Sequence, residues 1–252
     1  MPVSNADEPK ILTLETGASI AYRQTPGAGP SVVFLCGFMS DMTGAKALWL
    51  EEFCAQRGQG FLRFDYQGHG ASSGNFADGH VGVWANDAIA AIEKLTEGAQ
   101  ILIGSSMGGW IMLLAALAIP ERMAGLIGIA AAPDFTEELL GAELSAAQLA
   151  EIDAQGQTTI ASDYDDDYVI TKALLEEGRK HLVLGAEIAL DCPVRLIHGL
   201  DDISVPWQTA LRLQDKLRST DVDVILVKRG DHRLSEPEDL DRLGRTLAAL
   251  SD

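Results

Sequence analysis

The stretch Gly-Ser-Ser-Met-Gly at residues 104–108 stands between an apolar run at 100–104 and a helical pattern at 107–119. A G-x-S-x-G spacing between a strand and a helix is typical of a serine raised on a sharp turn, with its hydroxyl exposed at the end of a buried strand. The alternative is a Gly-Ser turn that only begins a helix. The strand and helix patterns on either side favour the first interpretation.

The turn holds two adjacent serines, and its geometry favours one of them. A strained turn of this kind leaves room only for small residues two positions before and two positions after the exposed serine. Ser106 has Gly104 and Gly108 there, whereas Ser105 has larger side chains at both positions. We therefore predict that Ser106 is a nucleophile. The helix that follows would direct its positive N-terminal end toward an oxyanion formed at this point.

Short apolar runs alternate with helical patterns along most of the chain. The runs are continuous, which is typical of strands buried on both faces, and their repetition with helices predicts a mostly parallel sheet covered on both sides. We expect one domain spanning residues 1–252. The expected strands are 11–15, 19–23, 31–36, 61–65, 100–104, 125–131, 194–198 and 222–228, and the expected helices are 44–57, 81–97, 107–119, 207–218 and 237–250.

One stretch interrupts this alternation. The stretch at about 134–190 is acidic and favours helix. It is far longer than a single crossover between strands requires. Several apolar residues recur there at helical spacing, so we predict a short helical lid insertion. We expect the acidic run 163–167 to be a solvated loop, because it lacks the ligand spacing and the turn glycine of a calcium-binding loop. The recurring residues are Leu139, Leu140, Leu144, Leu149 and Ile152.

A nucleophilic serine needs a general base and an acid that orients it. His232 follows the last expected strand, which is where the chain order Ser, Asp, His puts the base. The acid is expected after the strand that ends at His198, where two carboxylates adjoin. The frame H-G-x-x-D-x-x-V-P over 198–206 selects Asp202, and Asp201 is the alternative.

The same chemistry needs two backbone N–H groups that stabilise the oxyanion. One is expected from Met107, directly after the nucleophile, and the other from Phe38, in the loop after the strand 31–36. Met39 and Met107 are candidates for the walls of a substrate pocket, and an ordinary place in the core is an equally good interpretation of both. No step of this chemistry requires a cofactor or a metal.

The overall composition bears on partners and location. The formal net charge of −18 argues against a nucleic-acid surface and against adsorption to anionic lipid. The three cysteines lack C-x-x-C spacing, which favours a reducing compartment. Residues 1–10 are unlike a signal or transit peptide, and no apolar run approaches the roughly 18 residues that span a bilayer. We predict a cytoplasmic protein without membrane insertion, and no motif specifies an oligomeric state.

These motifs, in this order, resemble the α/β-hydrolase superfamily. More narrowly, the chain is similar to the group of mitochondrial palmitoyl-protein thioesterases that also hydrolyse acyl glucuronides. The resemblance implies an α/β-hydrolase fold, a triad of Ser106, Asp202 and His232, and a substrate with a greasy or aromatic acyl part. The substrate that the resemblance implies is a small-molecule ester or acyl-thioester, or an acylated protein. The narrower resemblance rests on 43–47, 51–54, 63–66, 109–110, 205–207 and 219–226.

Since residues 1–10 lack the features of a transit peptide, we expect a bacterial-type cytoplasmic homologue of this group. The expected reaction is acyl transfer through an acyl-enzyme on Ser106, followed by hydrolysis. The same triad would also serve a C–C bond hydrolase or a cofactor-free haloperoxidase. A non-catalytic binding scaffold is a more remote alternative, because such proteins usually lack a member of the triad.

Overall fold

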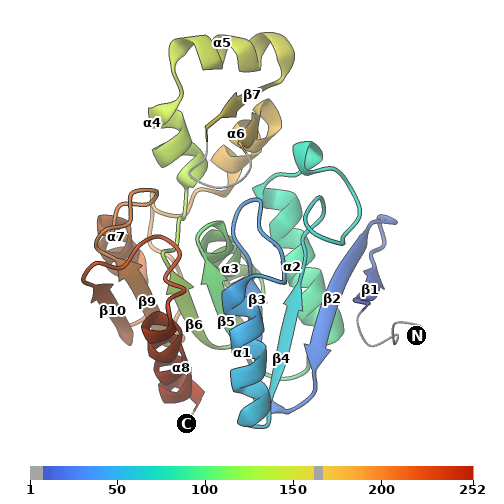
Figure 1. The fold of residues 1–252 in the computed structure, drawn as a ribbon, viewed down its shortest axis with the longest axis vertical. Coiled ribbons are helices and arrows are strands. Elements are labelled where there is room, and N and C mark those ends of the chain that lie inside the picture. The colour runs from blue at the N-terminus through green and yellow to red at the C-terminus, as the bar shows by residue number, and fades with distance from the viewer. Residues whose placement is uncertain (1–7, 162–166, 252) are drawn as a thin grey trace.

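The computed structural model describes residues 8–161 and 167–251. Its centre is an eight-stranded sheet in the order β1-β2-β4-β3-β5-β6-β9-β10 (Figure 1). The pairs β1–β2 and β2–β4 are antiparallel, and the other pairs of this sheet are parallel, which confirms the predicted mostly parallel sheet. The strands are β1 Lys10–Thr13, β2 Ser19–Thr25, β3 Ala28–Leu35, β4 Gln59–Phe64, β5 Gln100–Ser105, β6 Met123–Ile129, β9 Val194–Gly199 and β10 Val222–Val227.

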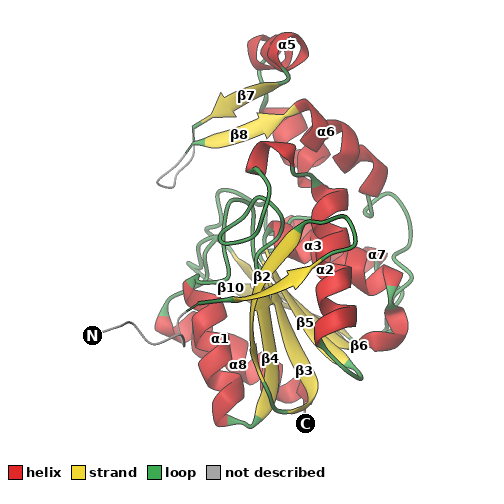
Figure 2. Ribbon diagram, turned by 90° about the vertical axis from the view of Figure 1, so that its right-hand side faces the viewer, coloured by secondary structure: helices red, strands yellow, loops and turns green. Residues whose placement is uncertain are grey.

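Helices cover both faces of this sheet, as predicted. Figure 2 shows α1 Ala45–Gln56 and α8 Pro237–Ser251 on one face, and α2 Val81–Leu95, α3 Met107–Ala118 and α7 Gln208–Lys216 on the other. The central strands are therefore shielded from water on both sides, and β5 is buried along its whole length. This arrangement explains why those strands read as continuous apolar runs.

The turn from β5 into α3 is a tight backbone junction. Ser106 has φ 55° and ψ −121°, a conformation that L residues rarely adopt. A Cβ on Gly104 would lie 2.6 Å from the carbonyl carbon of Gly108, and one on Gly108 would lie 2.5 Å from the carbonyl oxygen of Cys36. Only glycine fits at either position, which is the physical basis of the spacing found in the sequence.

The segment 134–190 lies over the carboxyl edge of the sheet (Figure 1). Its short helices agree with the prediction, but a two-stranded antiparallel hairpin, β7 with β8, was not predicted. Each strand has four residues, too few for periodicity to identify them, although both are rich in the β-branched residues that favour strands. The elements are the π-helical turn η3 Thr136–Leu140, α4 Gly141–Glu143, α5 Ala146–Gln155, β7 Gln157–Ile160, β8 Tyr168–Thr171, α6 Lys172–Gly178 and η4 Arg179–His181.

Most of the apolar residues that suggested a helical segment face inward. Leu140, Leu144 and Ile152 are buried and Leu139 packs against the core, whereas Leu149 is 43% exposed and belongs to the outer face of α5. Residues 163–166 of the acidic run lie outside the described residues.

One buried carboxylate ties the two ends of this segment together. Asp134 accepts hydrogen bonds from the backbone N–H groups of Val183 and Leu184, both at 2.8 Å. At the surface, Arg212 of α7 pairs with Glu138 at 2.6 Å and Arg179 with Glu137 at 2.8 Å. The backbone bonds to Asp134 are the stronger constraint, because exposed ion pairs contribute little.

The close approach at the turn leads to a stability prediction. We expect Gly104→Ala to lower the free energy of unfolding by about 2 kcal/mol or more, because the added methyl group meets backbone that no rotamer change can move. The melting temperature should fall by about 4 °C or more.

Gly185→Ala is the matched control, since a Cβ there meets nothing within 4 Å. Its melting temperature should be unchanged or slightly higher. Equal melting temperatures for the two variants would contradict the proposed close packing of the turn.

Candidate active site

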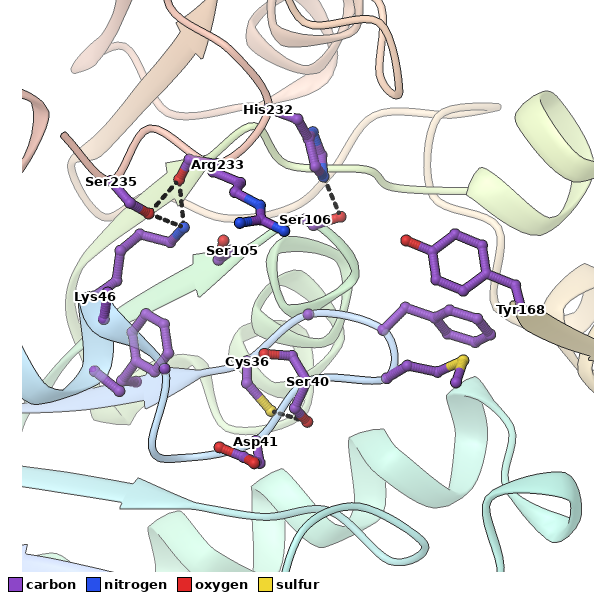
Figure 3. Close-up of a pocket in the computed structure, with 17 residues that line it drawn as sticks. Cys36, Ser40, Asp41, Lys46, Ser105, Ser106, Tyr168, His232, Arg233 and Ser235 are labelled. Atoms are coloured by element: carbon purple, nitrogen blue, oxygen red, sulfur yellow. Dashed lines mark hydrogen bonds between the residues drawn. The ribbon is translucent and has the colours of Figure 1, made fainter. Parts of the chain in front are cut away.

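Three side chains that are far apart in the sequence meet at the carboxyl edge of the sheet. Ser106 stands on the turn after β5, Asp202 follows β9 and His232 follows β10. His232 Nε2 lies 3.0 Å from Ser106 Oγ, and His232 Nδ1 lies 2.8 Å from Asp202 Oδ2. Figure 3 shows the imidazole of His232 directed at the serine hydroxyl. This is the arrangement of a nucleophile, a base and an orienting acid.

Asp202 is the carboxylate that contacts His232. Its side chain is fully buried, and Oδ1 accepts hydrogen bonds from the N–H groups of Ser204 at 2.9 Å and Val205 at 2.8 Å. Asp201 is exposed on the outer side of the same turn. Of the two alternatives, the structure therefore brings Asp202 to His232.

The pKa of Asp202 is lower than its ordinary value although the group is buried. Burial by itself raises the pKa of this carboxyl, but hydrogen bonds from His198 and His232 lower it further than burial raises it. The backbone N–H of Val205 acts in the same direction. Asp202 is therefore held as a carboxylate, the form that can accept the Nδ1–H of His232.

His198 is a residue of the site that the sequence marked only as structural. It is buried, and its Nε2 lies 3.0 Å from the carbonyl oxygen of Val205 and 3.2 Å from Asp202 Oδ2. Donation from this nitrogen fixes the carboxylate on the side opposite the backbone donors. The motif H-G-x-x-D contains this signal, because it puts a histidine four residues before the acid.

The loops that carry the acid and the base touch each other through backbone. A Cβ on Gly199, at the end of β9, would lie 2.5 Å from the carbonyl carbon of Gly230, which follows β10. The N–H of Asp201 donates to the carbonyl oxygen of Gly230 at 2.9 Å. The two loops are therefore packed against each other directly.

The predicted oxyanion donors flank the nucleophile. Met107 is the first residue of α3, so its N–H has no partner within the helix. Phe38 lies in the loop after β3, where a Cβ on the preceding Gly37 would lie 3.5 Å from Ser106 Cβ. Asp65 holds this loop by accepting the N–H of Met42 at 2.7 Å. Oxyanion stabilisation by these two residues stays a prediction.

Two cavities meet at Ser106 and His232, and Phe38 and Tyr168 also line both. The smaller, of about 200 Å³, is the apolar compartment; its polar lining residues include Glu143 and Ser204. The larger, of about 500 Å³, is named the polar compartment for its charged lining residues, although Phe34 and Met39 also line it. The apolar compartment is lined by Met107, Ala132, Phe135, Leu139, Leu140, Ile160, Ile203 and Val205. The polar compartment includes Met39, Ser40, Asp41, Lys46, Arg233 and Ser235.

The two methionines therefore line different compartments, Met107 the apolar one and Met39 the polar one. Sequence reasoning missed Lys46, Arg233 and Tyr168, which also line the site. Arg233 directly follows the predicted base, and Lys46 follows the loop of Phe38, so both lay close to motifs already recognised. Burial lowers the pKa of Lys46 to about 8, partly offset by the nearby carboxylate of Asp231.

Neither a metal site nor a membrane span is found in the described part of the chain. Residues 8–161 and 167–251 contain no group of three or more His, Cys, Asp or Glu side chains placed to hold a metal ion. Within the same ranges, every helix is too short or too polar to traverse a bilayer.

Comparison with known proteins identifies the family. The model of the family described as serine aminopeptidase, S33, matches residues 30–165. The mitochondrial palmitoyl-protein thioesterase ABHD10 of Mus musculus is 43% identical over 236 residues, which cover 93% of this chain and 79% of that protein. The chain belongs to the α/β-hydrolase superfamily. The human ABHD10 protein is 40% identical to this α/β-hydrolase, over 93% of this chain and 77% of its own.

Solved structures agree with this assignment of the α/β-hydrolase. Mouse α/β-hydrolase domain-containing protein 10 matches with a TM-score of 0.88 and 40% identity, over 96% of this chain and 97% of its own. A putative hydrolase from Agrobacterium vitis S4 matches with a TM-score of 0.93 and 38% identity, over 97% and 99%. Est1E from Butyrivibrio proteoclasticus, at 19% identity, TM-score 0.76 and coverage of 92% and 93%, supports the fold alone.

The two adjoining aspartates allow a matched test of the acid. We expect Asp202→Asn to lower kcat for p-nitrophenyl butyrate by about 10⁴-fold, because an amide can stabilise the wrong tautomer of His232. Asp201→Asn removes the same charge one residue away and should keep kcat within about threefold, since the exposed carboxylate is outside the site. A larger loss in Asp201→Asn than in Asp202→Asn would reassign the acid.

Proposed function

We propose that this α/β-hydrolase cleaves carboxylic esters or acyl-thioesters through an acyl-enzyme on Ser106. The observation that carries the proposal is the position of His232, which lies within hydrogen-bond distance of both Ser106 at 3.0 Å and Asp202 at 2.8 Å. This chain of contacts allows a proton to leave the serine hydroxyl as the hydroxyl attacks a carbonyl carbon.

In the first step, His232 Nε2 takes the hydroxyl proton and Ser106 Oγ bonds to the acyl carbon. The carbonyl electron pair moves to oxygen, where the N–H groups of Met107 and Phe38 would stabilise it. The intermediate then collapses, the bond to the leaving alcohol or thiol breaks, and the imidazolium returns its proton to that group. The carboxylate of Asp202 stabilises the imidazolium throughout.

In the second step, water replaces the leaving group. His232 takes a proton from water, the hydroxide bonds to the acyl carbon, and the bond to Ser106 Oγ breaks. The proton returns to the serine and the carboxylic acid leaves. No electrons are exchanged with a cofactor in either step.

The apolar compartment supports a greasy or aromatic acyl group. Its walls include Phe135, Leu139 and Val205 and adjoin the N-terminus of α3, so an acyl chain could lie there while its carbonyl faces Met107. The segment 134–190 supplies several of these walls, and we propose that it acts as a lid over the acyl chain within a single domain. The ABHD10 relatives are named palmitoyl-protein thioesterases, which supports an acylated protein as one substrate.

We also propose a cytoplasmic location. The three cysteines Cys36, Cys54 and Cys192 are unpaired, which fits a reducing compartment. The relatives carry the word mitochondrial in their names, and a mitochondrial matrix would fit unpaired cysteines equally well. Fractionation of the native host cells would distinguish the two locations.

The nucleophile can be tested against its neighbour. We expect Ser106→Ala to lower kcat for p-nitrophenyl butyrate and for an acyl-thioester by about 10⁶-fold, the size of loss seen when a triad serine is removed. Ser105→Ala should retain activity within about tenfold, since its hydroxyl takes no part in the proton transfer.

Labelling with a fluorophosphonate probe tests whether Ser106 is the reactive serine. Mass spectrometry of the labelled protein should find the adduct on residue 106, and Ser106→Ala should not be labelled. A Ser106→Ala variant as active as the unmodified protein would remove this residue from the mechanism.

If the acyl chain of the substrate lies in the apolar compartment, filling that compartment should change the preference for acyl chain length. Leu139→Trp should fill the apolar compartment and lower kcat/KM for p-nitrophenyl octanoate relative to the acetate. Each methylene that loses its site costs about 0.8 kcal/mol, or roughly fourfold, so displacement of two should change the ratio by more than about tenfold. Leu149→Trp, on the exposed face of α5, is the matched control. An unchanged ratio in Leu139→Trp would place the acyl chain elsewhere.

A further inference from the structure

Ile203 lines the apolar compartment, yet it is 83% exposed. Among the residues that the structure describes, no other large apolar residue is as exposed, and the next is Ile11 at 53%. A single exposed isoleucine on a protein surface needs no explanation. This one differs because it lies at the edge of a cavity that reaches Ser106.

The backbone that follows Ile203 is fixed by hydrogen bonds. Asp202 Oδ1 accepts the N–H groups of Ser204 at 2.9 Å and Val205 at 2.8 Å, and the carbonyl oxygen of Val205 lies 3.0 Å from His198 Nε2. The side chain of Asp202 is fully buried, so the turn cannot rearrange to bury Ile203 without losing these bonds. The turn that holds the carboxylate inward therefore also holds the isoleucine in water.

The apolar compartment opens to solvent beside Ile203. Its exposed lining residues are Glu143 and Ala161, both of the segment 134–190, and Ile203 of the loop after β9. At the other end of the compartment, Met107 is buried. The mouth of the compartment therefore lies between the segment 134–190 and the loop after β9.

The volume of the compartment limits how much of an acyl chain it can enclose. It is about 200 Å³, below the roughly 300–1,000 Å³ of pockets that bury most of a drug-sized ligand. A short acyl group can lie within it, whereas a long one such as palmitoyl extends through the mouth. At the mouth, Glu143 carries a charge that an apolar chain would desolvate and Ala161 is small, so Ile203 offers the largest apolar surface.

We propose that the distal part of a long acyl chain leaves the apolar compartment across Ile203, which makes this residue a determinant of acyl-chain specificity. The inference rests on the proposed function, which assigns the acyl group to this compartment. Contact with the chain removes apolar surface of the isoleucine from water. Only substrates long enough to reach the mouth obtain this gain, so the preference for long chains depends on the exposed isoleucine.

Esters of different chain length test the proposal. We expect Ile203→Ser to lower the ratio of kcat/KM for p-nitrophenyl laurate to that for p-nitrophenyl butyrate by about fivefold or more, because covering an isoleucine side chain fully is worth about tenfold or more in binding. The ratio cancels a disturbance of the neighbouring Asp202, which would lower both rates alike. Ile203→Met should keep the ratio within about twofold, since its flexible side chain offers a similar apolar surface.

Ile11→Ser is the matched control, because Ile11 is an exposed isoleucine of β1 outside the lining of both compartments. Its ratio should equal that of the unmodified protein. An unchanged ratio in Ile203→Ser would overturn the proposal, and equal losses for the two esters would mean that Ile203 only shapes the turn of Asp202. A ratio lowered as much by Ile203→Met as by Ile203→Ser would also overturn it, since loss of apolar surface would then not be the cause.

A binding measurement separates this inference from the proposed function. Calorimetry with Ser106→Ala should find laurate bound more tightly than butyrate, both below the concentration at which laurate forms micelles. Adding Ile203→Ser should lower the ratio of the two association constants by about fivefold or more. If the unmodified protein hydrolyses neither ester, the acyl-enzyme proposal fails, and this binding result alone decides whether the chain crosses Ile203. Equal ratios with and without Ile203→Ser would exclude that path.

Discussion

Backbone passes so close to backbone at residues 104–108 that side chains are excluded on both sides of the nucleophile. The carbonyls of Cys36 and Gly108 occupy the space that a Cβ on Gly108 or Gly104 would need. This contact brings the N-terminus of α3 against the end of β3, and with it the N–H of Met107 against the loop of Phe38. The position of the serine hydroxyl and the direction of α3 at this edge of the sheet depend on it.

Backbone strain gathers around the same edge of the sheet. Non-glycine residues with positive φ cost about 1–3 kcal/mol each where the surrounding structure holds them, and such residues cluster at functional sites. Several here lie next to the nucleophile, to the base or to the ends of strands that face the compartments. They are Met39, Ser106, Ala130, Asp134, Arg229 and Leu234.

The sequence predicted those parts of the structure in which the local backbone geometry and the overall fold require the same residue types. Continuous apolar runs identified the buried strands because both faces of β5 are covered. Gly104 and Gly108 identified Ser106 because only glycine fits there. The frame around Asp202 distinguished it from Asp201, and the structure brings that carboxylate to His232. The catalytic roles of these residues stay predictions.

What the sequence did not reveal depends on contacts between distant residues. β7 and β8 are four-residue strands that are stable only as a pair beside α5 and α6, so their pattern alone predicts little. Lys46 and Arg233 are 187 positions apart, and no spacing rule joins them in one cavity. His198 looked structural, and its contact with Asp202 appears only when the turn after β9 is folded.

Because Gly199 and Gly230 bring two loops into backbone contact, Asp202 and His232 lie on loops that pack directly against each other, whereas Ser106 stands on the turn between β5 and α3. β6 lies between these two parts of the site in the sheet. A displacement shared by the two loops would change the separation of Nε2 and Oγ and leave that of Nδ1 and Oδ2 unchanged.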